Sequence, residues 1–347
     1  MTAKTGASTR IIAKRGTTFG TAVAGGAGDK LEVESLEWGE NAEALRDNPI
    51  GSGLDMDNAS TRGATAPNVT ITKKARYNDA GTALETLLWG GESVMNMGGG
   101  LYSHSVLYNS TRNRAFHTVA WDGAVGSTIE VASLTPFRLT ERVDNPPNYL
   151  TQTIEGLGNV VSYASSTNTT TTLNSATVAD TTRIIVKPSD KFRLNLYSGS
   201  ALANGDTVNI KSFERVFEFP IEFAREIKNS AGNGQPIATG DAPLTSTLTI
   251  TMRNLDDVQF RMFINSQNDT QYKGDLTVTD AATGFSKVFY WPLLQQVDDP
   301  QWDLTGPNDN EVTITFKCLV SPTNPSGMIH GYPYSIITNN RSTAHET

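Results

Sequence analysis

Apolar and polar residues alternate along much of the chain, which is the pattern of half-buried β-strands. In residues 68–76, Val69 and Ile71 alternate with threonines, and residues 31–38 alternate in the same way. The same pattern predicts further strands at residues 101–108, 114–121, 128–140, 150–156, 215–223, 244–253, 272–279, 286–291 and 311–319. We therefore expect a mainly β protein.

A helical period replaces this alternation in one segment. Asn78 or Asp79 suits the N-cap of this helix, and Gly90 and Gly91 suit its end. Residues 254–266 carry the start signals of a second helix in the other half of the chain. The apolar residues of the first helix recur at i, i+3, i+4, i+7 and i+8, namely Ala80, Ala83, Leu84, Leu87 and Leu88.

Two short stretches occur twice, in the same order and at nearly the same spacing. Residues 9–14 read TRIIAK and residues 182–187 read TRIIVK, 173 positions later. Residues 28–37 resemble residues 205–214, which follow at an offset of 177 positions. Two ordered matches at similar offsets indicate a duplicated unit.

The duplication predicts two tandem domains joined by a linker. The first domain with its N-terminal arm covers residues 1–161, and the second with its C-terminal tail covers 182–347. Residues 162–181 between them are rich in Ser and Thr, a composition typical of a linker. Residues 39–66 and 225–243 show little periodicity, and loops of this length usually serve binding or assembly.

Composition narrows the function further. The chain has 347 residues with a formal net charge of −8, so a cationic surface that grips nucleic acid is not expected. Cys318 is the only cysteine, so no intramolecular disulfide forms. The sequence shows neither a signal peptide nor an apolar run of about 20 residues that would span a bilayer. We expect a soluble protein that is made in the cytoplasm.

No catalytic or metal site is predicted. Asp55 resembles the start of a calcium loop, but Ser60 and Ala66 stand where its Gly and Glu belong. The carboxylates of Asp298, Asp299 and Asp303 allow a glycosidase interpretation, although charged turn residues explain them more simply. The histidines are scattered without a metal-binding spacing, and they are His104, His117, His330 and His345. The tryptophans allow a carbohydrate-binding platform, but Trp121 and Trp291 end strands that we expect to be equivalent in the two copies, as core residues would. The tryptophans are Trp38, Trp89, Trp121, Trp291 and Trp302.

One stretch carries a family resemblance. Residues 16–22 read GTTFGTA and precede a strand, a long Gly- and Asn-rich loop, another strand and a short helix. This order resembles the tail tube proteins of long-tailed phages, and it recurs over most of both copies. The resemblance implies a β-sandwich flanked by a helix, with six such domains in a ring and the rings stacked into a tube. A two-domain chain would form the ring as a homotrimer.

The resemblance also implies where the protein acts and what it contacts. It implies a virion protein without a cofactor that meets itself, the tape-measure protein and the tail-terminator and tail-tip proteins, while double-stranded DNA passes without specific binding. Ring-to-ring contacts would map to residues 1–27, 39–66 and 225–243. Two other interpretations remain open: a capsid decoration or minor tail protein, and a carbohydrate-binding domain of a host-recognition fibre.

A wall along which DNA slides should carry neutral or negative side chains, because fixed cations bind phosphates. The polar faces of the predicted strands offer four candidates for such a wall. A solvated outer face is the alternative for each of them. The candidates are Glu32, Glu34, Glu218 and Glu222.

Overall fold

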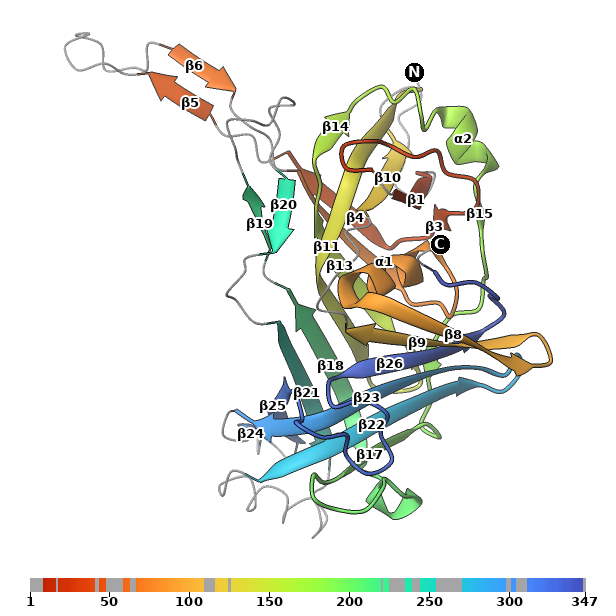
Figure 1. Cartoon of the computed structure of the whole chain (residues 1–347), viewed down its shortest axis with the longest axis vertical. Coiled ribbons are helices and arrows are strands. Elements are labelled where there is room, and N and C mark those ends of the chain that lie inside the picture. Colours follow the sequence, from red (N-terminus) through yellow and green to blue (C-terminus); the bar gives the residue numbers. More distant parts are fainter. Residues whose placement is uncertain are drawn as a thin grey trace.

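The fold is mainly β, as predicted (Figure 1). The structure is a computed structural model that describes residues 9–16, 18–40, 44–47, 59–62, 67–108, 116–123, 126–219, 221–224, 235–238, 244–253, 270–297, 301–303 and 311–345. The predicted helix at 254–266 lies outside these residues.

The first half contains one long helix, α1 (Ala80–Trp89), among strands. Its strands are β1 (Ile11–Gly16), β2 (Ala27–Gly28), β3 (Lys30–Leu31), β4 (Ser35–Gly39), β5 (Ala44–Asp47), β6 (Ala59–Arg62), β7 (Asn68–Lys74), β8 (Gly90–Gly98), β9 (Leu101–Tyr108), β10 (Phe116–Asp122), β11 (Thr128–Asp144), β12 (Asn148–Tyr149), β13 (Thr151–Leu157) and β14 (Val160–Ser162).

The second half begins after a short helix, α2 (Thr170–Ser175), and contains a 3-10 turn, η2 (Asn204–Asp206). Its strands are β15 (Thr177–Val178), β16 (Ile185–Val186), β17 (Lys191–Leu196), β18 (Ile210–Glu218), β19 (Ile221–Ala224), β20 (Gln235–Ala238), β21 (Thr245–Arg253), β22 (Gln271–Asp280), β23 (Phe285–Gln296), β24 (Gln301–Asp303), β25 (Glu311–Leu319) and β26 (Tyr334–Asn339).

Both halves pair their strands in the same order. In the first half, β1 pairs with β10, β10 with β11, β11 with both β13 and β14, β13 with β7, and β7 with β4. In the second half, β17, β22, β23, β25, β26, β21 and β18 make the corresponding six antiparallel pairings. Each half therefore has two sheets that share one long strand, β11 or β23.

The correspondence extends to single side chains. The hydroxyl oxygens of Thr72 and Thr153 lie 3.2 Å apart between β7 and β13. Those of Thr251 and Thr313 lie 3.1 Å apart between β21 and β25. Ile71 precedes Thr72 in β7, and Ile250 precedes Thr251 in β21. The two isoleucines therefore occupy corresponding core positions.

One of the two repeated stretches does not follow this correspondence. Leu36 pairs with Ile71 and Phe213 pairs with Ile250, so the 177-residue match lies on equivalent strands. The TRIIAK stretch contributes to β1, which pairs with β10. The TRIIVK stretch instead exchanges hydrogen bonds at Ile184 with Ala75 and Leu150, and the strand that corresponds to β1 by pairing is β17.

Helix α1 lies between the sheets of the two halves (Figure 1). Its N-cap is Asp79, whose carboxylate accepts a hydrogen bond from the Thr82 amide at 2.9 Å, and Gly90 ends it in the left-handed conformation (φ 83°). Lys73 contacts the same carboxylate at 2.6 Å in a fully buried ion pair. The capping prediction is confirmed, and the cap is charge-balanced.

Apart from one small cluster at α2, the buried apolar residues of the described chain form one continuous core through both halves rather than one core in each half. The rings of Trp89 on α1 and Phe217 on β18 pack at a tilt of 34° with centroids 3.8 Å apart, and those of Tyr77 and Phe285 lie 5.8 Å apart. Hairpin β8–β9 extends the second half, because β9 pairs with β26. Strand β26 lies in the predicted C-terminal tail, and it was not predicted because that segment is rich in Pro and Gly.

The segment predicted as a linker is folded. Within residues 162–181, α2 buries Leu173 and Ala176 against Ile12 and Ala120 of the first half. Asn168 is fully buried and donates to the Glu130 carboxylate at 2.6 Å. A Ser- and Thr-rich composition therefore covers a sheet here, because its hydroxyl and amide groups find partners.

Candidate assembly interface

A seven-stranded antiparallel sheet crosses the boundary between the halves. Its order is β4-β7-β13-β11-β18-β21-β25, and β11 and β18 join the first half to the second. One face is buried in the core, where Ile71, Ile154, Leu139 and Phe217 stand side by side in register. The opposite face is polar and holds a row in register across all seven strands: Ser35, Thr72, Thr153, Thr140, Val216, Thr247 and Lys317.

Charges on the polar face are largely paired. Arg138 lies 3.4 Å from Glu155 and 4.0 Å from Glu218. Arg142 lies 2.7 Å from Asp144 on the same strand. Because these groups are solvent-exposed, the pairs contribute little stability. They do cancel the charge of the arginines, so this surface presents mostly threonine hydroxyls and balanced charge.

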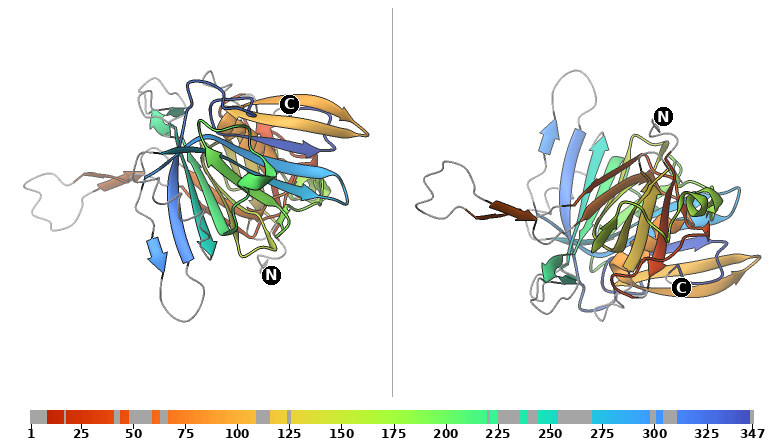
Figure 2. Two further views of the ribbon diagram at one scale, coloured as in Figure 1. Left: turned by 90° about the horizontal axis from the view of Figure 1, so that it is seen from below. Right: turned by 90° about the horizontal axis from the view of Figure 1, so that it is seen from above.

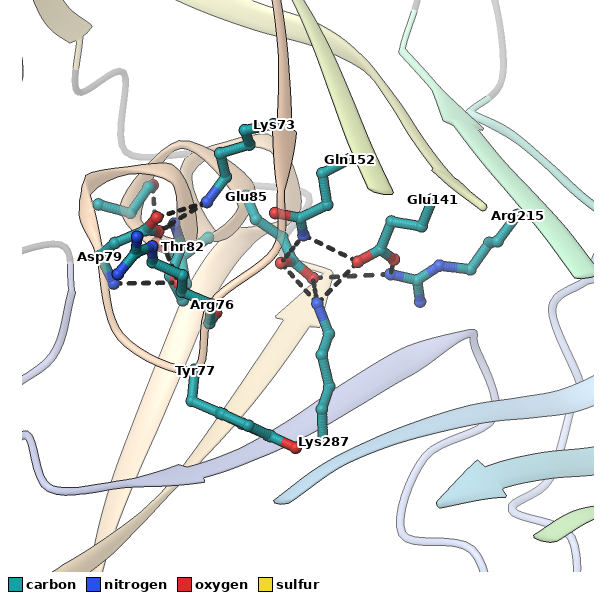
Figure 3. A network of polar contacts seen from close by, with 12 residues as sticks. Lys73, Arg76, Tyr77, Asp79, Thr82, Glu85, Glu141, Gln152, Arg215 and Lys287 are labelled. Atoms are coloured by element: carbon teal, nitrogen blue, oxygen red, sulfur yellow. Dashed lines mark hydrogen bonds and ion pairs between the residues drawn. The ribbon is translucent and has the colours of Figure 1, made fainter. Parts of the chain in front are cut away.

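The junction between β11 and β18 covers a buried polar network (Figure 3). Lys287 of β23 donates to both oxygens of Glu85 on α1, at 2.9 and 2.7 Å, and to Glu141 of β11 at 2.8 Å. Arg215 of β18 pairs with Glu141 and lies 3.6 Å from Glu85. Gln152 of β13 donates to both glutamates at 3.0 and 2.9 Å. The network joins strands of both halves.

Two carboxylates and two cations make this network neutral, and each charged side chain is at most 1% exposed. Burial by itself would raise the pKa of Glu141, but the charges of Arg215 and Lys287 outweigh it and hold that pKa well below its ordinary range. The guanidinium of Arg215 also lies over the Phe289 ring, 4.7 Å from its centroid. Losing one member leaves a buried charge without compensation.

One end of the seven-stranded sheet, β4, is open among the described residues, and the other end is open only along β24, because Leu294 and Gln295 of β23 also pair with β22. Strand β4 pairs only with β7 on one side. At the other end, β25 is bordered by the last residues of β23 and by β24, which has no further described partner. By the pairing order, β4 corresponds to β18, and the β23–β24 edge occupies the place of β11. The open edges thus correspond to the two strands that already meet inside the chain.

Each half also inserts a two-stranded hairpin at the same place in its pairing order. Strands β5 and β6 pair with each other between β4 and β7, and β19 and β20 pair between β18 and β21. Hairpin β5–β6 stands away from the body of the molecule (Figures 1 and 2). Strands β5 and β6 lie within the predicted loop 39–66 and β20 lies within the predicted loop 225–243, whereas β19 precedes that loop. The prediction of structureless loops is therefore wrong for the described parts of both segments.

The candidate wall glutamates lie beside cations rather than as free charges. Glu34 is 3.3 Å from Lys74, and Glu218 is 4.0 Å from Arg138. Glu32 pairs with Arg76 and lies 3.9 Å from Arg183. All three are roughly half exposed. Glu222 belongs to β19, and its side chain lies outside the described residues.

Two of the four histidines are not scattered as predicted. His104 and His345 both contact Glu92 through their Nδ1 atoms, at 2.6 and 2.7 Å. The three side chains are fully buried. Burial would raise the pKa of Glu92, but the hydrogen bonds from both histidines lower it to about 2. His117 and His330 lie elsewhere, and burial lowers the pKa of His117 to about 3.

The tryptophans are mostly core residues. Trp89, Trp121 and Trp291 are buried, but Trp121 lies in β10 and Trp291 in β23, which are not equivalent strands. The calcium-loop residues 55–58 lie outside the described residues, as do residues 298–299 and the side chains of Trp302 and Asp303.

No pattern along the chain indicates the residues of the junction. The four charged residues occupy positions where the alternating or helical pattern points into the core, and a charge there breaks the apolar pattern. They are Lys287, Arg215, Glu141 and Glu85. Only their pairing in space explains them.

Known proteins do not supply a function. No protein-family model matches the chain, and comparison with curated proteins finds no match. In the described part of the chain, no helix is both long and apolar enough to cross a membrane. The function proposed below therefore rests on the residues and contacts of this chain.

Proposed function

We propose that the chain is a structural virion protein that polymerises into the tail tube of a long-tailed phage. Three chains form a ring of six similar β-units, and rings stack into the conduit through which DNA leaves. The single observation that carries the proposal is the β11–β18 pairing, which joins two units edge to edge inside one chain. The two units also end at equivalent strands, which are β4 and β11 in the first half and β18 and the β23–β24 edge in the second. This equivalence supports tandem duplication.

The open edges favour a ring over a closed dimer. Strand β4 is the counterpart of β18, and the β23–β24 edge is the counterpart of β11, so the internal pairing can be repeated between chains. Such a contact joins two different surfaces and is heterologous. Repeating it either closes a ring or continues as a helix. Closure would also cover exposed strand edges, which are an aggregation hazard in a monomer.

The polar sheet face suits the wall of the bore. Threonine hydroxyls and paired charges offer few free cations for phosphates to bind by counterion release. Glu34 and Glu218 lie beside the cations Lys74 and Arg138 at this face and reduce its affinity for DNA further. We assign the face to the lumen on this basis.

The inserted hairpins suit ring-to-ring contacts. β5–β6 and β19–β20 make no described strand pairing with the body of the chain. A hairpin of two strands is marginally stable alone, so it gains most from a surface on a neighbouring ring. Virion location and contacts with tape-measure, tail-terminator and tail-tip proteins are part of the same proposal.

Electron microscopy of concentrated untagged protein tests the proposal. We expect hollow rods whose end-on views show six lobes, and mass measurement of the smallest closed species should give three 37.4-kDa chains. Discrete trimers without rods would favour capsid decoration. Monomers at all concentrations would contradict the proposal.

Proline in β4 provides an edge-specific control. Backbone N–H groups alternate sides along a strand, so one of the adjacent variants Leu36→Pro and Glu37→Pro removes an outward N–H. We expect that variant to keep the monomer fold by circular dichroism yet fail to form rings. Ring formation by both folded variants would exclude β4 as the contact edge.

A further inference from the structure

The buried cluster of Glu92, His104 and His345 plays no part in the proposed assembly surfaces. Glu92 lies in β8, His104 in β9, and His345 in the segment after β26. The side chains are fully shielded from solvent, and one ligand atom from each lies within 4.8 Å of the others. Carboxylate and imidazole groups in this combination are ligands of divalent transition metals.

The hydrogen bonds of the cluster define its protonation. A carboxylate oxygen only accepts, so the 2.6 and 2.7 Å contacts with Glu92 Oε1 require a proton on Nδ1 of each histidine. Nε2 of His104 lies 2.9 Å from the carbonyl oxygen of Arg341 and must also donate. His104 is therefore an imidazolium in the metal-free cluster. Nε2 of His345 is buried without a hydrogen-bond partner.

We propose that this cluster is a binding site for a divalent cation of the Zn²⁺ type, held by the Glu92 carboxylate and by Nδ1 of His104 and His345. The cation takes the place of the two Nδ1 protons. His104 releases one proton to solvent and becomes neutral. His345 moves its proton from Nδ1 to Nε2, which is the atom that has no partner in the metal-free cluster.

Surrounding contacts fit this assignment. Metal-ligating histidines usually donate their second ring N–H to a carbonyl or carboxylate, as His104 does to Arg341. Tetrahedral Zn²⁺ at ordinary bond lengths separates its N and O ligands by about 3.4 Å, so each contact with Glu92 must lengthen by about 0.7 Å. His345 follows β26 outside any strand, so strand pairing does not hold its backbone against this adjustment.

The site also borders a cavity and has a structural consequence. His345 lines a cavity of about 290 Å³ between β1, α1 and the segment after β26, so it is the member of the cluster that borders a cavity. Glu92 and His345 are 253 residues apart in the chain. A bound ion would therefore fasten the β8–β9 hairpin of the first half to the last described segment of the second half.

Titration of the untagged, EDTA-stripped and dialysed full chain with ZnCl₂ tests the site by calorimetry. We expect one ion per chain, and a rise in Tm of about 3 °C or more at 100-fold excess over Kd. His104→Ala and His345→Ala should each weaken binding at least about tenfold. His330→Ala, which alters a histidine outside the cluster, should bind as the parent chain does. Co²⁺ should give the visible absorption of a tetrahedral site.

Two results would overturn the assignment. One is that the folded chain shows no saturable binding at Zn²⁺ concentrations up to about 1 mM, because a Kd above that value is a weak affinity. The other is binding by His345→Ala that equals that of the parent chain. If Glu92→Gln fails to fold, the two histidine variants still decide. Rod formation does not enter this test, so its outcome is independent of the proposed tube.

Discussion

The internal junction and the open edge differ at one corresponding position. Arg215 on β18 pairs with Leu248, and Trp38 on β4 pairs with Val69, the counterpart of Leu248. Arg215 is fully buried and pairs with Glu141 across the junction. Trp38 is half-buried, with its ring centroid 5.5 Å from that of Trp121.

This difference is consistent with how each contact would form. Desolvating an ion pair is costly, and a junction inside one chain tolerates the cost because its partners are held at high effective concentration. A contact between separate chains gains more from a large aromatic anchor. The charged Arg215 at the closed junction therefore suits an intramolecular contact, and the aromatic Trp38 at the open edge suits an intermolecular one.

The largest expected effect comes from breaking the closed junction. Lys287→Met leaves Glu85 and Glu141 sharing one cation, and we expect the free energy of unfolding to fall by about 3–5 kcal/mol. Urea unfolding measures it. Lys317→Met, on the exposed face, should change stability by less than about 0.5 kcal/mol. The double variant Glu141→Gln, Lys287→Met keeps the network neutral and should recover part of the lost free energy of unfolding. A decrease of less than about 1 kcal/mol in Lys287→Met alone would contradict the stabilising role of the network.

The same junction predicts acid sensitivity. The pKa of Glu141 is lower in the folded chain than its ordinary value of 4.5, so its ion pairs stabilise the fold above that pH. This contribution is lost as the pH falls below about 4.5 towards the folded-state pKa. Urea midpoints measured from pH 7 to pH 3 should fall less steeply in the neutral double variant Glu141→Gln, Lys287→Met than in the parent chain. Equal slopes would assign the acid sensitivity to other carboxylates.

A smaller stability effect, with a large effect on assembly, is expected at the open edge. Trp38→Ala removes a half-buried ring and should cost the isolated chain about 1–2 kcal/mol. If β4 meets a neighbouring chain, the variant should also raise the protein concentration needed for rods at least tenfold. Trp38→Phe keeps an aromatic ring and should assemble more nearly as the parent chain does. Unchanged assembly by Trp38→Ala would remove the aromatic anchor from the proposal.

Local signals predicted the parts of the fold that depend on local chemistry. Strands β9 and β25 begin and end at the predicted residues, and Asp79 and Gly90 bound α1 as expected. Alternation also gave the core face of β7. These features depend on side-chain period and capping, which are written in a few neighbouring residues.

Features that depend on distant partners were not predictable in this way. The TRIIVK stretch resembles TRIIAK, yet Ile184 hydrogen-bonds to Ala75 and Leu150, since a six-residue word does not specify its neighbours. Strand β26 is stabilised by pairing with β23 and β9 rather than by its surroundings in sequence. The contact between Glu92 and His345 joins residues too far apart for any spacing rule.

The smallest effects should be equal in the two halves. Thr72→Val removes the hydroxyl contact with Thr153, and Thr251→Val removes the contact with Thr313. Both pairs are part-buried on the polar face, and each loss should lower the free energy of unfolding by about 0.5–1.5 kcal/mol. Urea unfolding of both variants measures the difference, which should be under about 0.5 kcal/mol if the positions are true counterparts. A clear inequality would show that the two halves share a pairing order without sharing its energetics.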